Sequence, residues 1–161
     1  MVNEKKQVVL MMGGPASGKS TVRKQVHGDL YVVDSDGIKE SHPDYDVNNP
    51  SALHAWSSRM ATKEFYSMLS GSTNFVFDGT GANAEKYVTF AKAAHEEGWS
   101  VKVLYVRCDV VTALQRNAKR ERTVNEDIVK EKYSTIAASH EIVAQYVDVV
   151  EVIDTGASAN S

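Results

Sequence analysis

Short runs of apolar residues alternate along the chain with longer stretches in which apolar residues recur every three or four positions. The short runs have the length of strands, and the longer stretches have the period of helices that bury one face. Strands are expected at residues 7–12, 30–33, 74–77, 100–106 and 148–153. Helices are expected at residues 19–27, 52–70, 84–97, 110–120 and 126–146. This alternation predicts an α/β fold, in which a five-stranded parallel sheet carries helices on both faces in three layers.

Residues typical of helix ends support these boundaries. Gly28 and Gly98 follow predicted helices, where a glycine can end the helix. Ser51, Asn83 and Asn125 precede predicted helices, where a short polar side chain can accept hydrogen bonds from the first backbone N–H groups. We therefore expect these five residues to cap helices.

Length and composition indicate a single domain. The 161 residues are enough to bury a core, and a content of 42% hydrophobic and 24% charged residues is typical of soluble globular proteins. We expect the domain to cover residues 1–154, with a lid near 116–125 and a flexible tail at 155–161. The one cysteine, Cys108, excludes a disulfide within the chain.

Charge and hydropathy also restrict the binding partners and the cellular location expected for the protein. The net charge of −3 gives no overall attraction to nucleic acid, so any basic surface has to be local. No apolar run reaches the length of a membrane span, and the first six residues lack the apolar centre of a signal peptide. These features predict a cytoplasmic protein, in the host cytoplasm if a phage encodes it.

The strongest chemical motif follows the first predicted strand. It matches the phosphate-binding pattern G-x-x-x-x-G-K-[ST] and lies between a strand and a helix, as the mechanism requires. The motif consists of Gly13, Gly14, Pro15, Ala16, Ser17, Gly18, Lys19 and Ser20, and is followed by Thr21. The backbone N–H groups of such a loop surround a polyphosphate, Lys19 reaches its β- and γ-phosphates, and the Ser20 hydroxyl binds Mg²⁺. The motif predicts that the chain binds a nucleoside triphosphate, with ATP and Mg²⁺ as the cofactors.

Two acidic residues end the second predicted strand and would face this triphosphate. A kinase that acts on an alcohol needs a carboxylate to orient the hydroxyl group and accept its proton. We assign this role to Asp36, because Asp34 belongs to the strand end and can instead cap the following turn. Lys39 lies three residues after Asp36, on the same face if a helix begins there, and could hold an anionic part of the acceptor.

Further candidates for the acceptor site come from two other segments. Asp78 follows the third predicted strand and could hold the Mg²⁺ shell, the acceptor or the loop backbone, and Thr80 could add a hydrogen bond. The segment 42–50 is rich in turn-forming residues and is a candidate substrate loop, in which His42 could contact substrate.

A cluster of cations lies at residues 107–122. Arg116 and Arg120 are four positions apart, so they would share one face of a helix, and Arg122 follows. Guanidinium groups stabilise the charge that develops on a transferring phosphoryl group. We therefore expect Arg116 and Arg120, with Arg122 as a further candidate, to close over the bound ATP from a lid.

Together these motifs resemble the small P-loop kinases that include phage-type polynucleotide 5′-kinases and zeta toxins. The resemblance to polynucleotide kinases covers most of the chain and is best at 13–21, at 31–41 and from 98 to 133. It implies that Asp36 is the general base, that Lys39 stands where that family has an arginine for an acceptor phosphate, and that Arg120 and Arg116 are lid arginines. The resemblance to zeta toxins is concentrated in residues 36–45, where Lys39 to Tyr45 look like their substrate loop.

The expected activity is transfer of the γ-phosphate of ATP to a hydroxyl group. The acceptor expected first is a nucleic acid or a nucleotide, as for polynucleotide 5′-hydroxyl kinases. Three alternatives remain open: a zeta-toxin-like kinase of a nucleotide sugar or other small metabolite, a DNA kinase of hydroxymethylated pyrimidines, and an ATP-binding regulatory module. The sequence leaves the oligomeric state undetermined.

Overall fold

A computed structural model describes residues 6–49, 51–120 and 124–156. Its five strands form one sheet in which every pairing is parallel. In chain order they are β1 (Gln7–Met12), β2 (Tyr31–Asp34), β3 (Phe75–Asp78), β4 (Ser100–Arg107) and β5 (Val149–Asp154). The spatial order is β2-β3-β1-β4-β5. The α/β fold with a five-stranded parallel sheet is therefore confirmed.

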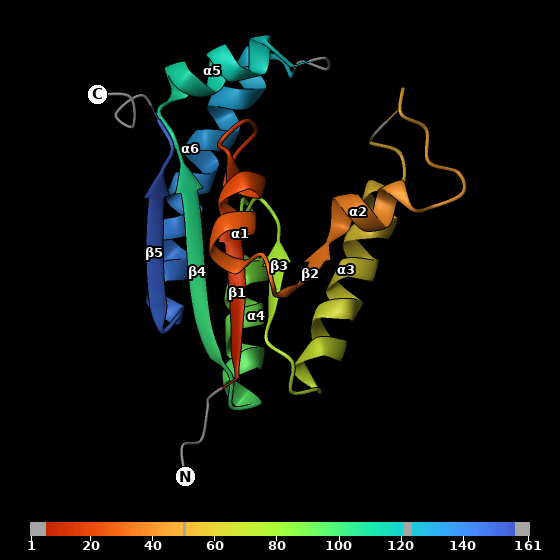
Figure 1. Cartoon of the computed structure of the whole chain (residues 1–161), viewed down its shortest axis with the longest axis vertical. Coiled ribbons are helices and arrows are strands. Elements are labelled where there is room, and N and C mark those ends of the chain that lie inside the picture. The colour runs from red at the N-terminus through yellow and green to blue at the C-terminus, as the bar shows by residue number, and fades with distance from the viewer. Residues whose placement is uncertain (1–5, 50, 121–123, 157–161) are drawn as a thin grey trace.

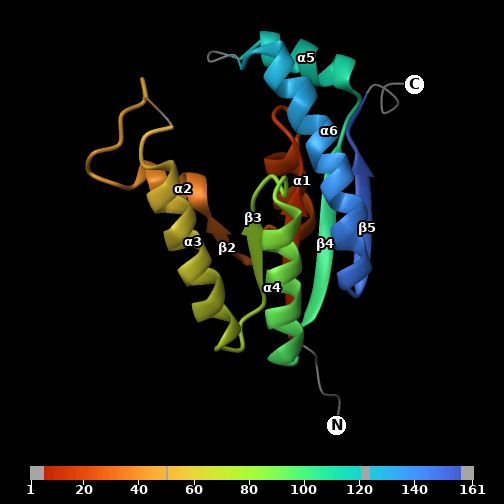
Figure 2. The same cartoon turned by 180° about the vertical axis from the view of Figure 1, so that it is seen from behind.

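Helices cover both faces of this sheet (Figures 1 and 2). They are α1 (Lys19–His27), α2 (Ser35–Glu40), α3 (His54–Leu69), α4 (Ala84–Glu96), α5 (Val110–Ala118) and α6 (Glu126–Val143), which continues into the short 3₁₀ turn η1 (Ala144–Tyr146). Figure 1 shows α1 on one face, with α4 and α6 behind the sheet and α5 beyond the strand ends. Figure 2 shows α3, α4 and α6 together on the other face.

The central strand β1 is buried on both faces because apolar residues follow one another without interruption. Val8, Leu10 and Met12 face the larger core, whereas Val9 and Met11 pack with Val22 of α1. Such continuous apolar runs are typical of parallel strands covered by helices on both sides.

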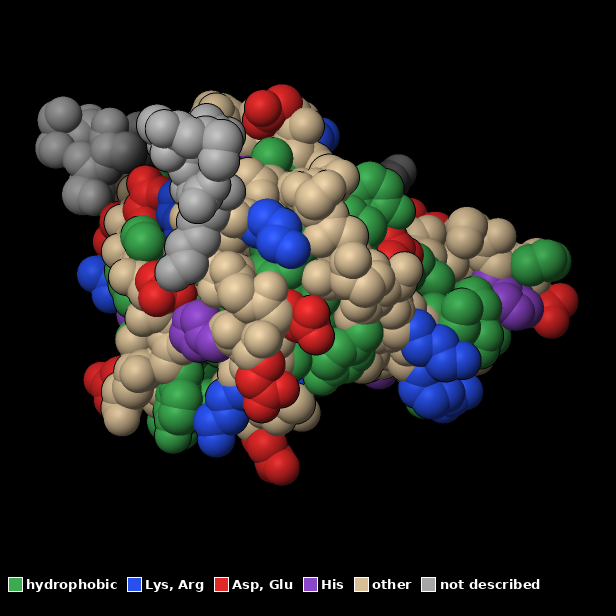
Figure 3. Space-filling view, turned by 90° about the horizontal axis from the view of Figure 1, so that it is seen from below, with side chains coloured by type: hydrophobic (Ala, Val, Ile, Leu, Met, Phe, Trp, Pro, Cys, Tyr) green, Lys and Arg blue, Asp and Glu red, His purple; other side chains and the backbone are tan. Residues whose placement is uncertain are grey.

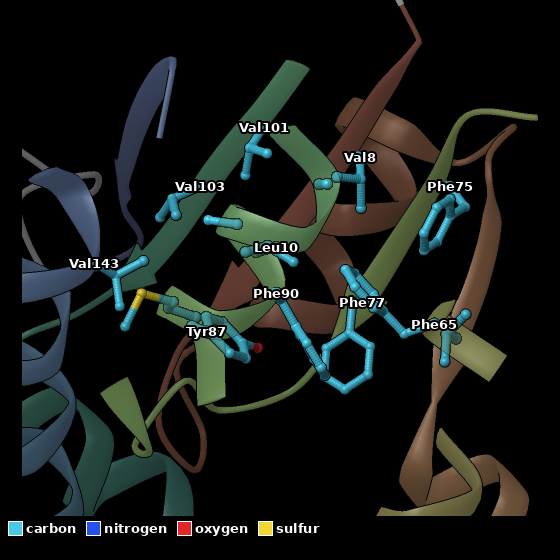
Figure 4. Close-up of a cluster of buried hydrophobic side chains, with 14 of the residues drawn as sticks. Val8, Leu10, Phe65, Phe75, Phe77, Tyr87, Phe90, Val101, Val103 and Val143 are labelled. Atoms are coloured by element: carbon cyan, nitrogen blue, oxygen red, sulfur yellow. The ribbon is translucent and has the colours of Figure 1, made fainter. Parts of the chain in front are cut away.

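Aromatic side chains fill the larger core between α3, α4 and the sheet (Figure 4). Phe65 of α3 stacks on Phe90 of α4 with the ring centroids 3.9 Å apart. Phe75 and Phe77 of β3 meet Phe65 edge to face, and all of these rings are buried. Each buried aromatic contributes roughly 1.5–3 kcal/mol through the hydrophobic effect, so this cluster fixes α3 against the sheet.

The helix boundaries agree with most of the expected caps. The side chains of Asn83 and Asn125 accept hydrogen bonds from the first turns of α4 and α6, as expected. Gly28 is the C-cap of α1, and Gly98, at φ 82°, follows α4 in the left-handed conformation. Ser51 was expected to cap α3, and this prediction is wrong: the helix begins at His54, and Leu53 takes the N-cap position at φ 68° without a side-chain hydrogen bond.

The strand order determines where ligands can bind. From β1 the chain passes outward to β2 and returns through β3, and it then crosses to β4 and β5 on the other side of β1. Parallel sheets bind ligands at the carboxyl ends of the strands, where such a reversal leaves a crevice. At the opposite end of the molecule, acidic and basic side chains are interspersed (Figure 3).

Candidate active site

The loop between β1 and α1 has the shape of an anion-binding cradle. Gly13 is buried, and its N–H donates to the carbonyl of Thr80 at 3.0 Å, which ties the start of the loop to the end of β3. Ala16 and Gly18 have positive φ angles of 61° and 88°. These turns bring the chain into α1 at Lys19, so the positive end of the helix dipole and the first N–H groups face the loop.

Tyr133 of α6 supports this loop from outside. Its hydroxyl donates to the Pro15 carbonyl at 2.8 Å and lies 3.4 Å from the Cys108 sulfur. A Cβ atom added at Gly14 would lie 2.4 Å from the Tyr133 ring, so only glycine fits there. Burial raises the pKa of the Tyr133 phenol, and its hydrogen bond with Cys108 adds to this, so the hydroxyl keeps its proton for the loop.

Arg116 and Thr155 connect the loop to the far strand. The Arg116 guanidinium donates to the carbonyl of Ala16 at 3.2 Å and to the hydroxyl of Thr155 at 3.1 Å. The Thr155 hydroxyl in turn donates to the carbonyl of Ser17. Thr155, the first residue of the expected tail, is thus one of the residues that hold the loop, and residues 157–161 lie outside the described residues. The guanidinium N–H groups of Arg116 that make these bonds therefore have a structural role, because they donate to acceptors within the protein.

Lys19 of the loop forms an ion pair with the end of β3. Its ammonium lies 2.9 Å from an Asp78 carboxylate oxygen and donates to the Gly79 carbonyl at 2.9 Å. Arg23, one turn further along α1, lies 3.2 Å from the other Asp78 oxygen. Asp78 was expected at the acceptor, the metal shell or the loop. The structure places its buried carboxylate between two cations of α1, where it positions the Lys19 ammonium.

The two carboxylates at the end of β2 have different surroundings. Asp34 is the N-cap of α2, and its side chain accepts from the N–H of Asp36 at 3.0 Å. Burial raises the pKa of the Asp34 carboxyl, and the nearby charge of Asp78 raises it further. The Asp36 side chain is 76% exposed. Asp34 is thus a capping residue, whereas Asp36 is open to a ligand.

Lys39 lies in a different environment from the one expected. Its side chain is 11% exposed, and its ammonium lies 3.8 Å from the Asp36 carboxylate. It does not line the cavities described below. Since α2 begins at Ser35, the spacing of three residues places Lys39 beside Asp36 along the helix. The expectation that Lys39 holds an anionic part of the acceptor is therefore not supported by its position.

Two cavities meet beside the loop. The loop cavity, of about 430 Å³, is lined by residues 13–21 together with Asp36, Thr80 and Arg120. The inner cavity, of about 480 Å³, is bordered by α2 and by the end of β3. It is lined by Lys19, Ser20, Asp34, Ser35, Asp36, His54, Ser58, Phe77, Asp78, Gly79, Thr80, Gly81, Ala82, Asn83, Lys86, Tyr87 and Lys132. Lys19, Ser20, Asp36 and Thr80 line both cavities.

A third cavity lies on the other side of the loop. This flank cavity, of about 490 Å³, is lined by Ala16, Gly18, Thr21, Val22, Gln25, Arg116, Arg120 and Thr155. Arg120 lines both the flank cavity and the loop cavity, although α5 ends at Ala118 and the two arginines do not share a continuous helix. Arg116 and Arg120 thus line the same cavity without sharing a helix face, and their role as lid arginines stays a prediction.

Two further expected residues do not join the site. His42 packs edge to face against Trp56 with ring centroids 4.7 Å apart, and its Nδ1 accepts from the Asp44 N–H. It is absent from the lining of all three cavities. Arg122 lies outside the described residues.

Several site residues were not found from the sequence. These residues are Arg23, Tyr133 and Lys86, which lie on helices and contact or line the site. The spacing of apolar residues in those helices predicts only which face is buried, and it does not indicate a ligand. The spacing of Arg23 four residues after Lys19, on the same face of α1, was the one signal that could have indicated its role.

The donor atoms fit a magnesium ion that binds mainly to phosphate. Ser20 offers one exposed hydroxyl at the point where the loop and inner cavities meet, with the Asp36 carboxylate on the same lining. Mg²⁺ in kinases is held by one or two protein groups, by phosphate oxygens and by water. Among the described residues, no group of three His, Cys, Asp or Glu side chains could hold a metal ion by itself.

The described part of the chain contains no helix with the length and apolar character needed to cross a bilayer.

The fold and the loop together define a class, that of the P-loop kinases. Among solved structures, that of the PezAT toxin–antitoxin system of Streptococcus pneumoniae is similar at a TM-score of 0.70 and 14% identity, covering 96% of this chain and 70% of that chain. The shikimate kinase of Bacteroides thetaiotaomicron is similar at a TM-score of 0.58 and 12% identity, covering 89% and 84%. At such identities the likeness establishes the shared fold.

Within that class, the chain belongs to the zeta toxin family, which it matches over residues 2–160. Toxin zeta of Streptococcus pyogenes is 26% identical over 148 residues, covering 84% of this chain and 51% of that protein. The chain thus spans about half the length of the curated relatives it matches. The resemblance to zeta toxins noted in the sequence is confirmed by this family match.

Proposed function

We propose that the protein is an ATP-dependent kinase that transfers the γ-phosphate of ATP to a hydroxyl group of a small nucleotide-like acceptor. The observation that carries this proposal is the meeting of the loop and inner cavities at Lys19, Ser20, Asp36 and Thr80. A triphosphate on one side of these residues and an alcohol on the other would be in line for transfer.

The donor is assigned to the loop and flank cavities. The N–H groups of residues 13–21 and the Lys19 ammonium bind the phosphates, and Mg²⁺ bound at Ser20 would neutralise the charge of the phosphate oxygens. The flank cavity, with Val22 and Gln25 on α1 and Thr155 after β5, has the size and mixed lining to hold the nucleoside part of ATP.

Lys19 changes partner when ATP binds. In the structure the Lys19 ammonium lies 2.9 Å from the Asp78 carboxylate. A triphosphate brings several negative charges to the same point, and the ammonium can turn to it while Arg23 continues to neutralise Asp78. Asp78 therefore positions the Lys19 ammonium beside the loop.

Asp36 is assigned as the general base. Its exposed carboxylate lines both cavities, so it can accept the proton of an acceptor hydroxyl as that oxygen attacks the γ-phosphorus. The bond from the γ-phosphorus to the bridging oxygen then breaks, and ADP leaves with its electron pair. Arg120, on the loop cavity, is placed to stabilise the charge on the transferring group.

The inner cavity supports a small acceptor over a polynucleotide. Its volume of about 480 Å³ is that of a pocket for a single small molecule. Lys39, the residue on which a polynucleotide acceptor depended, is buried beside Asp36. We therefore place the nucleotide-sugar or small-metabolite alternative ahead of the polynucleotide one.

An acceptor screen with γ-labelled ATP tests this choice. Nucleoside diphosphates, nucleotide sugars and oligonucleotides with free 5′-hydroxyl groups are offered at several salt concentrations. The proposal expects label on a small acceptor, a shallow dependence on salt and no competition by oligonucleotides, since a small acceptor releases few counterions. If the oligonucleotide is labelled, and this labelling falls steeply at high salt, the acceptor is a nucleic acid and the proposal of a small acceptor is wrong.

A further inference from the structure

One face of α1 lines the flank cavity beyond the phosphate loop. Thr21, Val22 and Gln25 all belong to this lining, and their spacing of three and four residues places them on one side of the helix. Gln25 follows Lys19 by six residues, which is about 9 Å along a helix axis. A nucleotide whose phosphates lie at Lys19 can therefore bring its base beside Gln25.

The side-chain amide of Gln25 is available to a ligand. Arg116, on the same cavity, already donates to the Ala16 carbonyl and to the Thr155 hydroxyl, and that hydroxyl donates to the Ser17 carbonyl. Gln25 is exposed, and no group in the part of the chain that the structure describes forms a hydrogen bond with its side chain.

An exposed glutamine on a helix is ordinarily a surface residue whose amide binds water. Gln25 differs because it borders a cavity of about 490 Å³, to which the neighbouring Val22 and Ala16 contribute apolar atoms. Apolar walls with a few placed polar groups are typical of pockets that bind and orient a small ligand. The ligand that suits this combination is a planar ring with hydrogen-bonding groups on its edge.

The carboxamide group matches the polar edge of adenine. Its carbonyl oxygen accepts from the N6–H of the base while its NH₂ group donates to N7, so two hydrogen bonds form side by side. Guanine has acceptors at both of these positions, O6 and N7, so the carbonyl oxygen of the amide would face another acceptor. A guanidinium has the opposite preference, because it donates to O6 and N7 of guanine together.

We propose that Gln25 selects ATP over GTP by binding N6 and N7 of the adenine base in the flank cavity. This inference rests on the proposed function and assigns the base preference of the donor site to one side chain. In the anti conformation of a nucleotide, the N7 edge lies on the side of the 5′-phosphates, and α1 leads from the phosphate loop to Gln25. Arg120 also lines the loop cavity and is left to the phosphates.

Equilibrium binding of non-hydrolysable analogues of ATP and GTP, with Mg²⁺ and without acceptor, tests the proposal. The wild type should bind the ATP analogue at least about tenfold more tightly than the GTP analogue. Gln25→Met keeps the length of the side chain and removes the amide, so it should weaken binding of the ATP analogue and reduce the ratio to below about threefold. Equal binding of both analogues by the wild type, or an unchanged ratio in the variant, overturns the proposal.

Gln115→Met is the matched control. Gln115 is an exposed glutamine of α5 beside Arg116, and it lines none of the three cavities. Its substitution should leave the ratio of the wild type unchanged. If it reduces the ratio as much as Gln25→Met does, the assignment to Gln25 is wrong. Tighter binding of the GTP analogue by the wild type would assign the base to an arginine of the cavity and also overturn the proposal.

Binding of 7-deaza-ATP tests which edge of the base is contacted. This nucleotide has a C–H group in place of N7, so the wild type should bind it about threefold to tenfold more weakly than ATP, whereas Gln25→Met should bind both equally. A wild type that does not distinguish the two overturns the proposed contact.

The same measurements separate this inference from the proposed function. If neither ATP nor GTP binds, the donor site and the inference are both wrong. An adenine preference that depends on Gln25, in a protein that transfers no phosphate, would support this inference and reject the kinase.

Discussion

Asp36 and Asp34 are two carboxylates with the same sequence context and different surroundings. Asp36 is exposed at the meeting point of two cavities, whereas Asp34 caps α2 and has a raised pKa through burial. A base has to reach the acceptor hydroxyl, so geometry selects Asp36.

Asp36→Asn should therefore lower the rate of transfer by about 10²–10⁴ and leave the affinity for ATP little changed. The asparagine keeps the shape of the side chain and loses its ability to accept a proton. Steady-state kinetics of this variant are compared with those of Asp34→Asn, which retains its capping oxygen. A larger loss in Asp34→Asn would show that the wrong carboxylate had been assigned.

Arg120 and Arg116 can likewise be separated at the level of single residues. Arg116 makes hydrogen bonds to the carbonyl of Ala16 and the hydroxyl of Thr155, whereas Arg120 is exposed and lines both donor cavities. Arg120 is thus the better placed to follow the charge on the transferring phosphoryl group.

Arg120→Ala should lower kcat more than it weakens ATP binding, because the charge that it stabilises develops in the transition state. Arg120→Lys should restore part of the rate, since an ammonium lacks the planar fork of a guanidinium. Lys119→Ala, at the exposed neighbouring position outside these cavities, is the control. If Arg120→Ala has the kcat of the wild type, Arg120 has no role in phosphoryl transfer and is a solvent-exposed surface residue.

At the scale of elements, α6 supports the phosphate loop through a single tyrosine. The Tyr133 hydroxyl donates to Pro15, and its ring occupies the space beside Gly14. Tyr133→Phe removes the hydrogen bond and keeps the ring, so ATP affinity should fall by the roughly 0.5–1.5 kcal/mol of one such bond. Titration of an ATP analogue measures this, with Tyr146→Phe as the control. An unchanged affinity in Tyr133→Phe would mean that the loop keeps its shape without α6.

The junction of β2 and α2 predicts a dependence of stability on pH. The pKa of Asp34 is raised in the folded state, so the unfolded chain loses this proton at a lower pH than the folded protein does. The Asp34 charge therefore disfavours folding above its usual pKa of 3.8, and this penalty disappears below it.

Asp34→Asn removes the charge and keeps the cap, because asparagine is as good an N-cap as aspartate. Its melting temperature should equal or exceed that of the wild type at about pH 8, and the difference should vanish near about pH 4. Thermal melts at several pH values test this. A variant that is less stable than the wild type at about pH 8 would show that the Asp34 charge stabilises the fold.

The pattern of apolar residues predicted the strands and most helices. Each of these elements buries one or both faces, and its apolar residues recur with the period of that element. The start of α3 was misplaced because Leu53 adopts a left-handed conformation, which no short-range rule anticipates for leucine. The phosphate loop and Asp36 could be proposed from the sequence because each follows a strand within a few residues. Tyr133, Thr155 and Lys86 were missed because long-range packing, rather than local sequence, brings them to the site.

For the whole molecule, the strand order explains how these parts meet. The loop after β1, the acids at the ends of β2 and β3, and the residues after β5 all lie at the carboxyl edge of one parallel sheet. α5 and α6 close this edge from above and behind (Figures 1 and 2). The donor and acceptor cavities therefore lie on either side of one small group of residues around Lys19.

The central claim is that the protein transfers the γ-phosphate of ATP to an acceptor hydroxyl group at the residues shared by the loop and inner cavities. The most direct measurement follows γ-labelled ATP and Mg²⁺ with the acceptor panel, for the wild type and for Lys19→Ala, with circular dichroism to confirm that both are folded. The account predicts one label on the acceptor for each ADP formed by the wild type, and none above background for a folded Lys19→Ala. Transfer by Lys19→Ala at the rate of the wild type would contradict it.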